Sequence, residues 1–83
     1  MKEIVMPKLG VMMEEGTVVR WLKAEGDQVN QGEVVLEIES DKAVVEVESP
    51  SSGILSGVEV KEGITVPIGT RLGLIDPLPL RHQ

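Results

Sequence analysis

Apolar residues in this chain occur in short runs that alternate with polar neighbours, and glycine or proline interrupts them every few residues. A period of two is typical of half-buried strands, and no stretch has the i, i+3, i+4 spacing of a stable helix. The predicted strands are Glu3–Met6, Val18–Leu22, Glu33–Glu39, Val44–Glu48, Ile54–Val60 and Arg71–Ile75, with short pairings near Gln28–Val29 and Thr65–Val66. We therefore expect an all-β sandwich or barrel.

The chain also repeats itself at an offset of 37 residues. Three glycines, one glutamate and two β-branched residues recur in one register, which predicts a duplicated half and two sheets related by a pseudo-twofold axis. The matched positions are Gly16, Glu25, Gly26, Val29, Gly32 and Ile38 against Gly53, Glu62, Gly63, Val66, Gly69 and Ile75.

The character of the sequence changes after Ile75. Asp76, Pro77 and Pro79 cannot continue a central strand. We expect one domain over residues 1–76, followed at 77–83 by the start of a linker or by a tail, in which His82 is solvated.

Composition excludes several classes of function. The chain has 14 acidic against 8 basic residues and a net charge of −6, which argues against binding to nucleic acid. Trp21, the one aromatic residue, is interpreted as a packed strand residue. The apolar runs are too short to span a membrane. Without cysteine there is no thiol nucleophile or disulfide, and no metal-ligand cluster or nucleophile–base pair can be assembled.

Two alternating segments meet around Ser40, Asp41 and Lys42 and predict a β-hairpin. Lys42 is then expected at the apex, pointing away from both sheets. It is also the one basic residue between Glu33 and Glu48, a stretch with six carboxylates. Val34, Leu36 and Ile38 are expected to face the core. Beyond the turn, Ala43, Val45 and Val47 alternate with Val44, Glu46 and Glu48.

A lysine at a hairpin tip is usually only a solvated residue. Here, however, Glu39-Ser40-Asp41-Lys42-Ala43 resembles the modified-lysine motif of lipoyl domains from 2-oxo acid dehydrogenase acyltransferases. The resemblance runs from about Lys2 to Asp76. Its other segments are Met6-Pro7-Lys8-Leu9-Gly10, Met13 to Lys23, Glu25-Gly26-Asp27, Gly32-Glu33, Glu62-Gly63 and Val66-Pro67-Ile68-Gly69.

The resemblance implies a flattened barrel of two four-stranded antiparallel sheets, with Lys42 amidated by lipoic acid. A domain of this kind is monomeric and catalyses nothing itself; tethering raises the local concentration of its swinging arm at successive active sites. The implied partners are a lipoate-attaching enzyme, a thiamin-diphosphate-dependent decarboxylase, an acyltransferase core and dihydrolipoamide dehydrogenase. The implied compartment is the cytoplasm, or the mitochondrial matrix in a eukaryote.

The resemblance also suggests recognition residues. The connection Lys8 to Gly16 matches a loop beside the lysine hairpin that helps the decarboxylase recognise its domain, so Glu14 and Glu15 are candidate contacts. Glu39 matches a position that is often acidic near lipoylated lysines. Asp41 and Ala43 flank the lysine and complete the candidate recognition set.

Three other readings share features with this chain. Biotinyl domains have the same fold, but methionine normally flanks their lysine on both sides. The lipoylated carrier of glycine cleavage is longer and has added helical segments. Lipoyl-like barrels also serve as unmodified structural modules in membrane-fusion proteins, where an acidic hairpin around Asp-Lys-Ala has no purpose.

Overall fold

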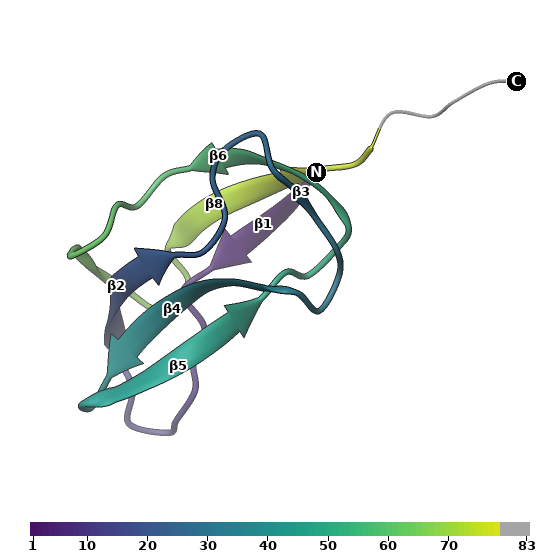
Figure 1. Cartoon of the computed structure of the whole chain (residues 1–83). Coiled ribbons are helices and arrows are strands. Elements are labelled where there is room, and N and C mark those ends of the chain that lie inside the picture. The colour runs from purple at the N-terminus through teal and green to yellow at the C-terminus, as the bar shows by residue number, and fades with distance from the viewer. Residues whose placement is uncertain (79–83) are drawn as a thin grey trace, which may run out of the picture.

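The computed structural model describes residues 1–78, which form eight β-strands and no helix (Figure 1). All six predicted strands and both short pairings are present. The strands are β1 Lys2–Val5, β2 Glu15–Trp21, β3 Gln28–Val29, β4 Val34–Ser40, β5 Ala43–Glu48, β6 Gly53–Val58, β7 Thr65–Pro67 and β8 Arg71–Asp76.

Most predicted boundaries differ from the observed ones by one residue at most, and two differ by more. β2 begins at Glu15 rather than Val18, because Glu15 and Thr17 pair with Pro67 and Thr65 of β7. β6 ends at Val58 rather than Val60. Both differences lie where a strand meets a connection, and the pairing partner rather than the local alternation sets the boundary there.

The strands form two four-stranded antiparallel sheets, in the orders β1-β8-β6-β3 and β5-β4-β2-β7. This confirms the predicted flattened barrel and its pseudo-twofold. The 37-residue offset carries β2, β3 and β4 onto β6, β7 and β8. Backbone hydrogen bonds follow the same relation: Gly26 N–H donates to Leu55 O at 2.7 Å, and its counterpart Gly63 N–H donates to Val18 O at 2.7 Å.

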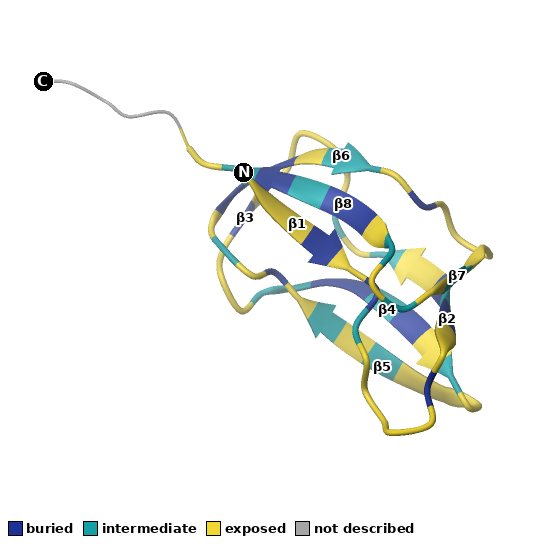
Figure 2. Ribbon diagram, turned by 180° about the vertical axis from the view of Figure 1, so that it is seen from behind, coloured by how far each residue is buried: buried dark blue, intermediate teal, exposed yellow. Residues whose placement is uncertain are grey.

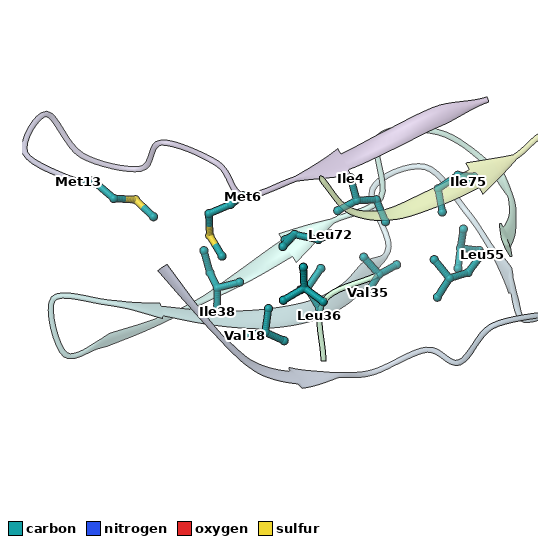
Figure 3. Close-up of a cluster of buried hydrophobic side chains, with 12 residues drawn as sticks. Ile4, Met6, Met13, Val18, Val35, Leu36, Ile38, Leu55, Leu72 and Ile75 are labelled. Atoms are coloured by element: carbon teal, nitrogen blue, oxygen red, sulfur yellow. The ribbon is translucent and has the colours of Figure 1, made fainter. Parts of the chain in front are cut away.

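The core lies between the two sheets and receives side chains from both (Figure 3). One prediction about it was wrong. Val34 is only half-buried, whereas Val35 and Leu36 are both fully buried, because the β4–β5 register shifts between Val34 and Leu36. Such a bulge places two neighbours on the same side of a strand. Val45 and Val47 are half-buried against the core, whereas Ala43, in the same phase of the alternation, is exposed.

Trp21 is confirmed as a packed strand residue. Its ring is half-buried, and its Nε1–H donates a hydrogen bond to Val60 O at 2.9 Å. Gly73 of β8 makes room for it: a Cβ at Gly73 would lie 3.0 Å from the Trp21 ring. The side chain therefore spans from one sheet to the other.

β8 ends at Asp76, the last residue of the predicted domain. The prediction that Asp76 cannot continue a central strand was wrong, because β8 lies between β1 and β6 and Asp76 pairs with Ile54 of β6. The linker start expected at 77–83 lies mostly outside the described residues, as does His82, so this division of the chain stays a prediction. Residues 1–78 contain no helix that is long and apolar enough to cross a bilayer.

Candidate functional site

The predicted hairpin places Lys42 at its apex. Ser40 and Ala43 are the last paired residues of β4 and β5, which leaves Asp41 and Lys42 as a two-residue turn. Both have positive φ, 52° and 63°, as in the type I′ turn whose twist matches the flanking strands. Lys42 is exposed. Figure 1 shows β4 and β5 joined by this turn at one end of the molecule.

The connection from β1 to β2 lies beside this turn. Met13 anchors it: the side chain is only 8% exposed, and its Sδ accepts a hydrogen bond from Leu9 N–H at 3.3 Å. Figure 3 shows Met13 reaching from this loop toward Met6 at one end of the core. With its base fixed, the loop leaves Val11 and Met12 almost fully exposed, at 89% and 86%.

An open groove of about 620 Å³ lies between the β4–β5 hairpin, the β1–β2 loop and β7. The groove brings together most of the residues singled out in the sequence. Its lining includes Glu14, Glu15, Glu39, Asp41 and Lys42, together with Met12, Met13, Gly16, Thr17, Ser40 and Thr65. Ala43 instead lines a neighbouring, more apolar hollow of about 390 Å³, with Leu9, Gly10, Val11, Met12, Met13, Ser40, Asp41 and Val45.

The charged side chains that line the groove form no ion pairs with one another within residues 1–78. Among the residues that the structure describes, no ion pair involves Lys42 or the groove carboxylates Glu14, Glu15, Glu39 and Asp41. The same part of the chain holds no group of three acidic or histidine side chains that could bind a metal ion. The groove therefore presents an exposed amine beside separate carboxylates.

The ionisable groups whose pKa is shifted from its ordinary value lie outside the groove. Lys23 Nζ lies 2.8 Å from Glu33 Oε2. This side-chain hydrogen bond raises the pKa of Lys23 and lowers the pKa of Glu33, which Asn30 N–H lowers further. These residues follow β2 and precede β4, at the opposite end of these strands from the Lys42 turn.

Sequence reasoning did not separate the roles of the two loop methionines. The two methionines are neighbours of the same type in the sequence, yet in the structure Met12 is exposed and Met13 is a buried anchor. Sequence reasoning also did not single out the exposed apolar tip formed by Val11 and Met12. No alternation in the loop indicates which methionine turns inward, because the contact of Leu9 N–H with Met13 Sδ depends on the folded loop.

Comparison with known proteins gives concordant matches. The model of the family described as "Biotin-requiring enzyme" matches residues 2–75. A solution structure of the lipoyl domain of the 2-oxoglutarate dehydrogenase complex from Azotobacter vinelandii superposes with a TM-score of 0.77 and 32% identity, covering 93% of this chain and 98% of that domain.

Curated relatives are larger proteins. Component 5 of the dihydrolipoyllysine-residue acetyltransferase of the chloroplastic pyruvate dehydrogenase complex of Arabidopsis thaliana is 45% identical over 74 residues, 89% of this chain and 16% of its own length. The acetyltransferase of the pyruvate dehydrogenase complex of Rickettsia prowazekii is 46% identical over 88% of this chain. That of the acetoin cleaving system of Pseudomonas putida is 44% identical over 87%. The chain spans 16% to 20% of these three relatives.

Proposed function

The chain belongs to the "Biotin-requiring enzyme" family and is a lipoyl domain within it, and on this basis we propose that Lys42 carries the lipoyl group. One observation carries the assignment to this residue. Lys42 is the lysine at the apex of the β4–β5 turn, exposed and without an ion pair among residues 1–78. Lys23, in contrast, is held by Glu33 at 2.8 Å.

The residues around Lys42 fit a tethered group. The turn holds its Cα at the end of a paired ladder, and the exposed side chain adds about 6 Å of flexible reach. When attached, the lipoyl group supplies a dithiolane that takes up acyl groups and reducing equivalents. The domain fixes where this arm begins, and in our proposal it contributes no catalytic residue of its own.

A lipoyl cargo is favoured over biotin. The matched relatives named above are dihydrolipoyllysine-residue acetyltransferases, and the matched solution structure is a lipoyl domain. The flanking residues Asp41 and Ala43 agree, since biotinyl lysines normally lie between methionines. A purely structural role fits less well, because it gives no reason for an exposed lysine in a left-handed turn.

We further propose the partners that this carrier role requires. They are a lipoate-attaching enzyme, a thiamin-diphosphate-dependent decarboxylase, the acyltransferase core and dihydrolipoamide dehydrogenase of a 2-oxo acid dehydrogenase complex, in the cytoplasm or the mitochondrial matrix. The groove supports Glu14 and Glu15 as contacts for the decarboxylase, because both line it together with Lys42. Glu39 and Asp41 line the same groove and are proposed contacts for the attaching enzyme.

The test is to incubate the domain with a lipoate–protein ligase, ATP and lipoic acid, and to map the modified peptide by mass spectrometry. We expect one lipoyl amide, on Lys42, and none on Lys2, Lys8, Lys23 or Lys61. Lys42→Arg keeps the charge and should abolish modification. Asp41→Lys with Lys42→Ala, which moves the amine one position along the turn, should do the same. A lipoyl group on Lys23, or efficient modification of either variant, would contradict the assignment.

A further inference from the structure

β5 is the longest strand edge that the fold leaves open. The four edge strands are β1 and β3 in one sheet and β5 and β7 in the other. β3 has two residues, β7 has three and includes Pro67, and β1 has four, whereas β5 has six. Figure 2 shows β5 at the margin of its sheet, with exposed residues along it. Long open edges are surfaces to which another extended chain can add.

The hairpin determines which backbone groups of β5 face outward. In a two-residue hairpin the residues closing the turn, Ser40 and Ala43, exchange both backbone hydrogen bonds. Ala43, Val45 and Val47 therefore direct their backbone groups at β4. Val44 and Glu46 direct theirs away from the sheet. Within residues 1–78, no hydrogen bond outside the β4–β5 ladder involves the backbone of 43–48.

The charges beside this edge favour a basic partner. Glu46 and Glu48 are exposed, and neither has an ion pair in the described part of the chain. Glu46 also lies directly opposite Glu37, whose carboxylate already binds Arg20 at 3.2 Å. Like charges opposite each other destabilise a sheet. A second copy of this chain added antiparallel to β5 would bring further glutamates against these, so charge disfavours self-pairing.

The position of the edge indicates which partner it serves. β5 begins at the residue after Lys42. An unmodified lysine side chain reaches only about 6 Å from its Cα, so the enzyme that acylates it must bring its own surface against the turn. Enzymes that act on the completed arm can stay further away. The nearest open hydrogen-bonding surface to the acceptor amine is therefore of most use to the attaching enzyme.

We propose that the lipoate-attaching enzyme docks by adding an extended strand, with Lys or Arg at alternate positions, to the free edge of β5 along Val44–Glu48. This rests on the proposed lipoylation of Lys42. In that reaction Lys42 Nζ forms the amide C–N bond with an activated lipoyl carboxyl group. The activating group leaves with the electron pair of its bond to the carboxyl carbon, and the amine loses a proton to solvent.

A proline substitution tests the β5 edge while leaving the fold intact. Glu46→Pro removes an outward-facing N–H, and proline is tolerated in an edge strand where the N–H faces solvent. The pseudo-twofold supplies a matched control in Glu3 of β1. Glu3 pairs with Leu74 as Glu46 pairs with Glu37, and the 37-residue offset relates Leu74 to Glu37. Glu3→Pro therefore makes the same backbone change on an edge remote in sequence from Lys42, and it also removes the contact of the Glu3 carboxylate with Arg71 at 3.5 Å.

We expect the lipoylation rate at limiting domain concentration to fall about tenfold for Glu46→Pro, as one lost backbone hydrogen bond and one lost charge would give. Glu46→Gln, which keeps the N–H, should lose only about two- to threefold, a loss that added salt removes. Glu3→Pro should match the parent. Equal rates for Glu46→Pro and Glu3→Pro would overturn the docking proposal while leaving lipoylation intact. An unmodified parent would overturn the proposed function and this inference with it.

Amide hydrogen exchange gives a second measurement that needs no proline. A Lys42→Arg domain can bind the attaching enzyme without reacting. Binding should slow exchange at Val44 and Glu46, whose N–H groups face outward, and leave Val45 and Val47, already paired with β4, little changed. Uniform protection along β5, or none at Val44 and Glu46, would contradict strand addition.

Discussion

At the scale of single residues, the turn at Asp41 and Lys42 has an unfavourable backbone conformation. Both residues have positive φ, a region that costs a non-glycine residue about 1 kcal/mol or more. The second position of such a turn is normally glycine. Lysine occupies it here, which is understandable if the amine is needed at the apex.

This conformational cost is testable with Lys42→Gly and Lys42→Ala. Neither variant can be lipoylated, so they compare stability alone. Glycine relieves the left-handed strain and alanine does not, so we expect Lys42→Gly to unfold with a free energy about 0.5–1 kcal/mol higher than Lys42→Ala. Urea denaturation followed by circular dichroism measures the difference. If alanine is as stable as glycine here, the turn is not strained in solution.

How far the sequence predicts single residues differs along the chain. The place of Lys42 follows from two alternating segments that converge on it, and the structure confirms that it lies at the apex. The burial of Val35 does not follow, because the bulge that turns Val35 and Leu36 to the same side arises from pairing with β5, on a different part of the chain. Burial of Met13 likewise depends on a loop conformation that no periodicity encodes.

At the scale of elements, all six predicted strands and both short pairings exist because local alternation and turn residues agree with the pairing that the fold imposes. The β1–β2 loop is different. In the pseudo-twofold it corresponds to the shorter connection between β5 and β6, residues 49–52, whereas the loop itself covers residues 6–14. The longer copy lies beside the Lys42 turn, so the symmetry is broken at the site where partners would bind.

If the decarboxylase recognises the β1–β2 loop, the charges of this loop should affect reductive acylation and should not affect lipoylation. For Glu14→Ala with Glu15→Ala, we expect normal attachment to Lys42 and slower reductive acylation, by about 0.5–1 kcal/mol per residue for charges at the rim of an interface. The loss should shrink as ionic strength rises. Rates for matched lipoylated samples at low and high salt measure this. Equal rates for variant and parent at low salt would remove these two residues from the recognition surface.

At the scale of the whole molecule, the pseudo-twofold also organises contacts between the two halves. Glu62 Oε2 accepts a hydrogen bond from Trp21 N–H at 3.0 Å, and its counterpart Glu25 Oε2 accepts one from Val58 N–H at 2.7 Å. The 37-residue offset relates both the carboxylates and the amides. Each bond joins a turn in one half to the end of a strand in the other, so the two are symmetric contacts between the halves.

The two symmetric contacts should contribute equally to the free energy of unfolding. We expect Glu25→Ala and Glu62→Ala each to lower the free energy of unfolding by about 1 kcal/mol, since each leaves one strand-end N–H without its carboxylate. Glu48→Ala, which removes an exposed carboxylate with no ion pair among residues 1–78, is the control and should change stability little. Urea denaturation measures all three. Fluorescence distinguishes the two contacts, because Trp21 is the one tryptophan. Glu62→Ala should shift the native emission of Trp21, and Glu25→Ala should leave it nearly unchanged. If only one of the two substitutions costs more than the control, the halves are alike in topology but not in the energetics that hold them together.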